Sequence, residues 1–142
     1  MTGAGAAQRA FVLATASVAL AVAGCAGSPA TSIPQLANPA SDNCAAQGGR
    51  VVIETAASGQ YGVCLFEDNR QCEEWALLRG ACPAGGIRVT GYATPEARYC
   101  AIRGGDYAVT RQETATMPEA GTCTLPGEPP CDALALYERR CP

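Results

Sequence analysis

The sequence predicts an α+β protein made of two small disulfide-stapled units in tandem, each a helix, a β-hairpin and a second helix. The main observation is a repeat. Residues 38–83 and residues 94–142 each contain four cysteines, and the last three lie 8 and then 10 positions apart in both copies. The apolar pattern also changes from helical to strand-like and back within each copy. These features indicate internal duplication. The repeated cysteines are Cys44, Cys64, Cys72 and Cys82, then Cys100, Cys123, Cys131 and Cys141.

Residues 1–24 have the pattern of a secretory signal peptide. Arg9 is the only charged residue before an apolar run over 10–23, which is short for a membrane span. Small residues then precede Cys25, an arrangement that resembles the bacterial lipoprotein box. The resemblance implies a diacylglycerol and an acyl chain on Cys25, which would anchor the protein to a membrane. In such lipoproteins Ala26, in place of aspartate, favours the outer membrane, and we expect the protein to face the periplasm.

The segment that follows the anchor is rich in Ala, Ser, Pro, Thr and Gly. Residues 25–37 therefore read as the lipidated cysteine and a flexible tether. Of the nine cysteines, one would be lipidated, and the remaining eight can pair completely.

Each copy is expected to begin with a helix. A capping side chain followed by proline predicts its start at Asn38 and at Thr94. Glycine pairs at 48–49 and 104–105 predict its end, because glycine readily forms a left-handed cap.

A β-hairpin is expected next. The β-branched run Val51–Ile53, matched by Tyr107–Val109, predicts the first strand. A turn at 58–60 leads to a second strand, Tyr61–Glu67, whose Gly62, Cys64 and Phe66 alternate onto one face.

A second helix is expected to close each unit. In the first copy Cys72, Trp75 and Leu78 recur at a spacing of three, and Gly80 ends the pattern. Residues 84–93 link the units. Within this linker, residues 87–90 are a candidate for a short extra strand against either hairpin, an alternative that the sequence leaves open.

The first copy combines several features at set positions: Asn38–Ser41, Cys44, Gly48, Gly49, Gly62, Cys64, Phe66, Asp68, Cys72, Glu74, Trp75, Gly80 and Cys82. This combination resembles the bacterial family catalogued as domain of unknown function 333, whose members are often labelled haemolysins. The second copy keeps the cysteines and the glycine pair but has Leu134 in place of Trp75. The resemblance implies a small envelope lipoprotein with no established catalytic residue.

Composition excludes several function classes. The formal net charge is −3, which gives no electrostatic case for nucleic acid as a partner. Histidine is absent, so the commonest general base is missing and we expect no enzyme and no cofactor. Cysteine gaps of 8 and 10 do not fit the close pairs of zinc sites, so no metal is expected. Disulfides are favoured because an exported chain meets an oxidising compartment and units this small need staples.

Four cysteines allow three disulfide connectivities per unit, and spacing alone cannot choose between them. Helices packed side by side along the hairpin favour one of these. A bond between Cys72 and Cys82 is expected least, because a helix of about two turns would hold them further apart than the usual ~4.4–6.8 Å. The rival set joins Cys44 to Cys82 and Cys64 to Cys72. The favoured bonds are Cys44–Cys72, Cys64–Cys82, Cys100–Cys131 and Cys123–Cys141.

Few polar side chains stand out as functional. Glu73 and Glu74 are expected on a solvated helix face. Asp68 is expected to cap backbone in a turn, with a ligand-binding or partner-contacting carboxylate as the alternative. Trp75 is expected in the core, with an exposed partner contact as the alternative.

These exclusions leave a binding or structural role. We expect a non-catalytic, lipid-anchored lipoprotein of the cell envelope that contacts an envelope protein or a cell-wall partner. One alternative is a hydrolase inhibitor that presents the insertion around Met117 and Pro118 as a rigid loop. A further alternative is a cytolysin, although no long amphipathic or apolar segment follows Cys25.

Overall fold

The computed structural model describes residues 38–141, so the expected signal peptide, lipid anchor and tether lie outside the described residues. The described residues belong to one compact unit. Within residues 38–141 the fold is α+β, with four α-helices, two small antiparallel sheets and four disulfides, as the sequence predicts. No helix within the described residues is long and apolar enough to span a membrane.

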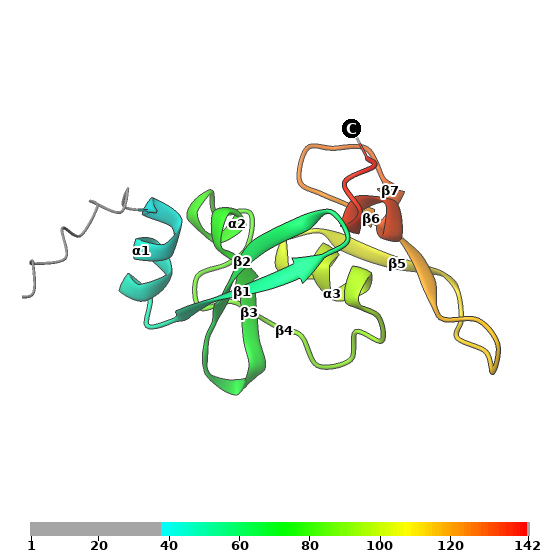
Figure 1. Ribbon diagram of the computed structural model, residues 1–142, viewed down its shortest axis with the longest axis horizontal. Helices are drawn as coiled ribbons and strands as arrows, with labels where there is room; N and C mark the ends of the chain where they lie inside the picture. The colour runs from blue at the N-terminus through cyan, green and yellow to red at the C-terminus, as the bar shows by residue number, and fades with distance from the viewer. Residues whose placement is uncertain (1–37, 142) are drawn as a thin grey trace, which may run out of the picture. The chain divides into compact units, whose positions relative to one another are not determined.

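The first half forms a four-stranded antiparallel sheet of order β1-β2-β3-β4 (Figure 1). One helix precedes the sheet and another lies between its last two strands in the sequence. The elements are α1 (Pro39–Ala46), β1 (Arg50–Ala56), β2 (Gly59–Leu65), a 3-10 turn (Glu67–Asn69), β3 (Arg70–Glu73), α2 (Glu74–Leu78) and β4 (Ile87–Arg88).

The second half repeats this order without a strand equivalent to β4 among the described residues. Its sheet has the order β5-β6-β7, and the β5–β6 hairpin extends away from α3 in Figure 1. The elements are α3 (Pro95–Ile102), β5 (Asp106–Arg111), β6 (Ala120–Thr124), β7 (Cys131–Asp132) and α4 (Ala133–Tyr137).

The predicted helix starts are confirmed. The Asn38 side chain accepts a hydrogen bond from the backbone N–H of Ala40, and the Thr94 side chain accepts one from Ala97 at 3.2 Å. Proline occupies the first turn of both helices, where its missing N–H costs no intrahelical bond. These local signals fix both starts independently of tertiary packing.

The two glycines of each pair have different roles. Gly48 and Gly104 have φ of 80° and 82°, the left-handed conformation expected after a helix. Gly49 does not. A Cβ on Gly49 would lie 2.4 Å from the Sγ of Cys64 and 3.0 Å from that of Cys44. The second glycine therefore leaves room for a disulfide that joins the helix to the hairpin.

The predicted disulfide pairing is wrong in both halves. The bonds join each initial helix to the second hairpin strand, and β3 or β7 to the segment after the last helix. Cys72 and Cys82 lie only 5.9 Å apart at Cα, although their bond was the one expected least. The observed bonds are Cys44–Cys64, Cys72–Cys82, Cys100–Cys123 and Cys131–Cys141.

The pairing prediction failed because it placed Cys72 in a helix. Cys72 lies in β3, directly opposite Cys64 of β2, and α2 begins only at Glu74. The helix is five residues long, and Gly80 then turns the chain with φ 74° so that Cys82 returns beside β3. The linker strand β4 likewise pairs with this unpredicted third strand, not with either strand of a hairpin.

An apolar cluster joins the two halves. Tyr61 and Val63 of β2 pack in the same buried cluster as Ile102 of α3 and Leu136 of α4. A second cluster surrounds the two disulfides of the first half. The disulfides are therefore part of the core itself, as expected for sheets this small.

Candidate interaction surface

The start of α2 is fixed by two buried carboxylates, which corrects the expectation that they lie on a solvated face. Glu73 is 8% exposed and caps the helix: its side chain accepts hydrogen bonds from the backbone N–H groups of Trp75 (3.1 Å) and Ala76 (2.8 Å). The guanidinium of Arg79, at the other end of α2, lies 3.9 Å from the same carboxylate. Glu73 thus supports the helix.

Glu74 ties α2 to the start of α1. It is 5% exposed and accepts hydrogen bonds from the Asn38 amide at 3.0 Å and from the Ser41 hydroxyl at 2.7 Å. Gly62 makes room for it, because a Cβ there would lie 2.4 Å from the Glu74 Cδ. Burying a charge without such partners would be costly.

The second half has no carboxylate at the corresponding position. By the cysteine register, Thr94, Ala97 and Ala133 occupy the positions of Asn38, Ser41 and Glu74, and the two alanines are fully buried. All members of the contact change together, as expected if a buried carboxylate and its donors must be kept or lost as a set.

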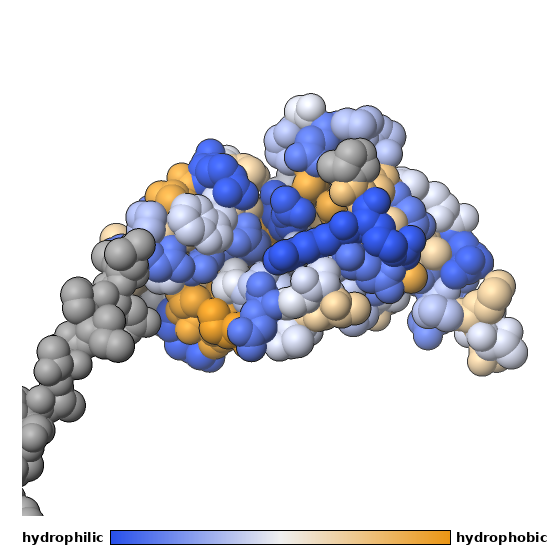
Figure 2. Space-filling view, turned by 45° about the horizontal axis from the view of Figure 1, so that its top comes forward, coloured by the Kyte–Doolittle hydropathy of each residue, from blue (hydrophilic) through white to orange (hydrophobic). Residues whose placement is uncertain are grey.

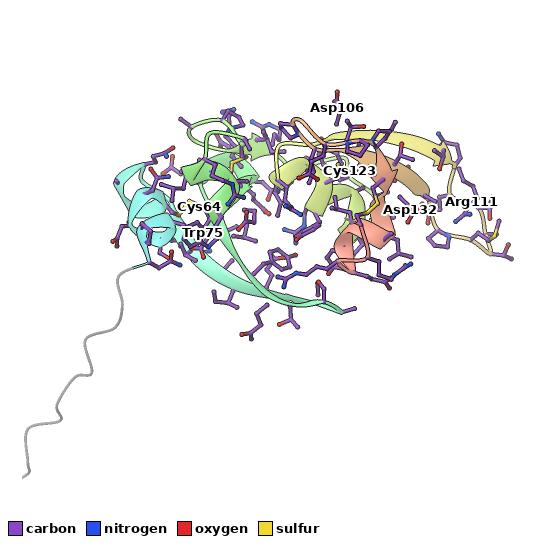
Figure 3. The ribbon with its side chains drawn as sticks, turned by 90° about the horizontal axis from the view of Figure 1, so that it is seen from above. Cys64, Trp75, Asp106, Arg111, Cys123 and Asp132 are labelled. Carbon is purple, nitrogen blue, oxygen red and sulfur yellow. A yellow bond between two sulfur atoms is a disulfide. The ribbon has the colours of Figure 1, made fainter. Side chains whose placement is uncertain are left out.

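The anchoring of Glu73 and Glu74 turns Trp75 outward, so it is not the buried core residue that we expected. Its side chain is 41% exposed, and Figure 3 labels it among the elements of the first half. A hollow of about 300 Å³ is lined by Trp75, Ile53 and Tyr61 on one side and by the polar side chains of Gln60, Glu73, Glu74 and Arg139. Ile53 is itself 61% exposed, so the hollow presents apolar side chains to solvent.

A neighbouring hollow of about 360 Å³ brings three arginines to the same tryptophan. Trp75, Arg79, Arg103 and Arg139 all line it. The one acidic side chain there is Glu73, whose oxygens already accept backbone N–H groups. Together the two hollows hold these three arginines and two buried glutamates, Glu73 and Glu74, so the arginines are in excess by one. We call these residues the Trp75 surface: Ile53, Tyr61, Trp75, Arg79, Arg103 and Arg139.

The arginines come from the ends of three different helices. Arg79 and Arg103 are the C-caps of α2 and α3, and Arg139 follows the C-cap of α4. Cations are favourable at helix C-termini, which carry partial negative charge. An arginine at the end of three of the four predicted helices is the sequence signal that could have identified them. That they converge on Trp75 depends on tertiary packing.

The floor of this surface is a packed aromatic row. The rings of Tyr61 and Tyr99 lie 5.0 Å apart edge to face, those of Tyr99 and Tyr137 lie 5.3 Å apart, and the Arg103 guanidinium lies 5.6 Å from the Tyr99 ring. Such contacts stabilise beyond simple burial. They hold the underside of the surface in place.

The carboxylate of Glu54 holds the Tyr61 end of this aromatic row in place. The Tyr61 hydroxyl donates to Glu54 at 2.9 Å, and burial followed by this hydrogen bond raises the pKa of Tyr61 well above its ordinary 10.0. Arg98 donates to Glu54 at 3.1 Å and to Gln71 at 2.6 Å. Burial alone would raise the pKa of Glu54, but hydrogen bonds from Arg98 and Tyr61 lower it below 4.5.

Asp68 does not join the Trp75 surface, since it lines neither hollow. Its backbone has φ 55°, a left-handed conformation, and the repeat places Gly127, with φ 79°, at the same position. Asp68 is therefore a turn residue by its backbone conformation.

All eight cysteines of the described residues form disulfides, as the sequence predicts. Within residues 38–141 no group of three or more His, Cys, Asp or Glu side chains is placed to hold a metal. The Trp75 surface presents aromatic, aliphatic and guanidinium groups to solvent.

Residues 35–81 match a family model, Domain of unknown function (DUF333). The match covers most of the first half and includes Trp75, Glu74 and the Asn38 and Ser41 that hold Glu74. No curated protein and no solved structure matches the chain. The family description states no activity, so the function rests on the surface itself.

Proposed function

We propose that this chain is a non-catalytic lipoprotein of the bacterial cell envelope that binds an anionic envelope partner through the Trp75 surface. Support for the anchor comes from the sequence alone: an apolar segment and small residues before Cys25. Cys25 carries the lipid, residues 25–37 tether the folded part, and residues 38–83 and 94–142 are duplicated units. The outer membrane, facing the periplasm, is the proposed location.

The observation that carries the binding role is the half-exposed Trp75 among three arginines. Tryptophan and arginine are the residues that most often dominate binding energy at interfaces. Arginine recognises carboxylates and phosphates through paired N–H donors, and an aromatic ring stacks on planar groups and sugar faces. An envelope protein with an exposed acidic segment, or an acidic cell-wall polymer, fits this chemistry.

The test is capture of envelope components by the purified full chain, with matched variants at equivalent positions. Trp75→Ala should abolish capture, because it removes the most exposed aromatic side chain of the surface. Leu134→Ala is the control, since Leu134 is the repeat equivalent of Trp75 and is 45% exposed. Equal capture by the wild type and by Trp75→Ala would refute the proposed surface.

A second candidate function, hydrolase inhibition, is favoured by one feature of the β5–β6 loop. Met117 is 47% exposed, and the loop is closed by hydrogen bonds from the Thr114 N–H to the Met117 carbonyl (2.9 Å) and from the Met117 N–H to the Thr114 hydroxyl (3.1 Å). A loop held in this way presents its tip at low entropic cost. Inhibition of an envelope protease that Met117→Asp abolishes would support this role.

A further inference from the structure

In the first half, the linker covers the outer edge of β3. Ile87 lies opposite Gln71 in the antiparallel pairing, and its side chain packs against the cluster that contains the Cys72–Cys82 disulfide. Gly86 is buried beneath this strand: a Cβ there would lie 2.8 Å from the Phe66 ring and 2.9 Å from the Gln71 nitrogen. A side chain at position 86 would therefore clash, and Ile87 adds an aliphatic contact beside it.

In the second half, a cavity of about 480 Å³ lies at the equivalent place. Among the described residues β7 is the last strand of its sheet, so no segment corresponds to β4. The cavity is lined by Leu125, Pro130 and Leu136, which occupy the positions of Phe66, Gln71 and Leu77. Its wall includes the Cys131–Cys141 disulfide, the counterpart of Cys72–Cys82.

We propose that this cavity binds an extended peptide segment of a partner protein, in the place and direction that Gly86 and Ile87 take in the first half. The proposed ligand pattern is taken from the first half: a glycine over the residue at position 125, then an aliphatic side chain against the disulfide. This site is separate from the Trp75 surface, because the two sets of lining residues share no member.

The charge at the cavity rim adds a third requirement. In the first half, the Asn69 carbonyl accepts from Val89 at 3.2 Å, and the Asn69 amide donates to the Thr90 hydroxyl at 3.3 Å. Glu128 takes the place of Asn69 in the second half and lines the cavity. A lysine or arginine at the ligand position equivalent to Thr90 would therefore face a carboxylate.

The backbone makes a smaller contribution than in the first half. Pro129 and Pro130 stand where Arg70 and Gln71 pair with β4, and proline has no N–H to donate to an added strand. Carbonyl oxygens remain as acceptors. Recognition must then depend on the residue types of the ligand. The proposed pattern is a glycine, an aliphatic residue, two unspecified residues, and a lysine or arginine.

The probe is a fluorescent peptide with the sequence of residues 85–90 and the change Thr90→Lys, titrated with the purified full chain by anisotropy. We expect saturable binding, and we expect the same peptide with Ile87→Asp to bind at least about tenfold more weakly, because the aliphatic contact is lost. Amide shifts on binding should appear at Cys131, Asp132 and Leu136, which would place the peptide at β7.

The matched protein variants are Glu128→Lys and Glu113→Lys, both at exposed positions, which change the net charge equally. We expect Glu128→Lys to weaken the peptide with Thr90→Lys by roughly fivefold or more, and Glu113→Lys to leave it nearly unchanged. Equal binding of the Ile87→Asp peptide would overturn the proposal, as would equal effects of the two protein variants. Amide shifts confined to β3 and β4 would also overturn it, because they would show exchange with the first half's own strand.

Discussion

Arg98 of α3 forms an ion pair with Glu54 of β1, and each of its terminal nitrogens donates to one oxygen of that carboxylate. The pair joins the two halves of the chain beside the tyrosine row beneath the Trp75 surface. Both side chains are about three-quarters buried. Removing one partner would leave the other poorly solvated.

The first prediction concerns this ion pair. Arg98→Met should lower the free energy of unfolding by about 1–3 kcal/mol, because Glu54 would lose its paired donors in a partly buried place. The measurement is denaturant unfolding with the disulfides intact. Arg88→Met, at an exposed arginine of β4, is the control and should change stability by less than about 0.5 kcal/mol. Similar losses for the two variants would contradict the role of the pair.

The second prediction is a pH dependence. The hydrogen bonds from Arg98 and Tyr61 hold the pKa of Glu54 below its ordinary 4.5. A carboxylate with a depressed folded-state pKa stabilises the fold above its unfolded pKa, and this stabilisation is lost as pH falls through the folded pKa. The stability difference between wild type and Glu54→Gln should therefore be largest above pH 4.5 and shrink below it. A difference that stays constant down to pH 2 would show that ionisation of Glu54 does not matter.

The third prediction uses the residues at the start of α2 that differ between the two halves. Glu74→Ala should destabilise by about 1–3 kcal/mol, since it leaves the Asn38 amide and the Ser41 hydroxyl without their acceptor. Adding Asn38→Thr and Ser41→Ala installs the set found in the second half. The triple variant should therefore be more stable than Glu74→Ala alone, which thermal unfolding can measure. Additive losses would refute the view that these residues act as a set.

The fourth prediction concerns the glycine beside the first disulfide. Gly49→Ala should prevent closure of Cys44–Cys64, because the new Cβ would overlap a disulfide sulfur. Alkylation without reductant, followed by mass spectrometry, should then detect thiols at these two cysteines. Gly59→Ala is the control, since its φ of 119° brings backbone strain without any neighbour within 4 Å. Complete oxidation of Gly49→Ala would contradict the observed packing.

The fifth prediction separates charge from backbone strain at the Trp75 surface. Arg139 has φ 54° where the first half has Gly80 with φ 74°. Arg139→Gly should therefore leave stability unchanged or raise it by up to about 1 kcal/mol, while it weakens partner binding through the lost cation. Unfolding and capture assays on the same variant check both outcomes. Loss of both stability and binding would assign Arg139 a structural role.

Local signals explain what the sequence predicted correctly. The caps at Asn38 and Thr94 act within one turn, and the hairpin strands follow from alternation and β-branched residues. The α+β class and the involvement of all eight repeat cysteines in disulfides were predictable for the same reason. Each of these features depends on residues close together in the chain.

The failures share a tertiary cause. Cys72, Trp75 and Leu78 have helical spacing, but Cys72 lies in a strand, where it stands opposite Cys64 in the antiparallel pairing of β2 with β3. Because Cys72 was expected in a helix and lies in a strand, the expected disulfides are wrong. The burial of Glu74 depends on donors more than thirty residues away, and a period-based argument cannot find them. The three arginines are local to their helices, but their convergence is not.

The most direct test of the proposed binding role is photocrosslinking in living cells that produce the chain with p-benzoylphenylalanine at position 75 or, as a matched control, at position 134. If the Trp75 surface binds an envelope partner, position 75 should give a discrete crosslinked product and position 134 should give none. The product should be lost in the Cys25→Ser variant, because this change should prevent anchoring. Identical crosslinks from both positions, or none from position 75 in an anchored and fully oxidised protein, would contradict the proposal.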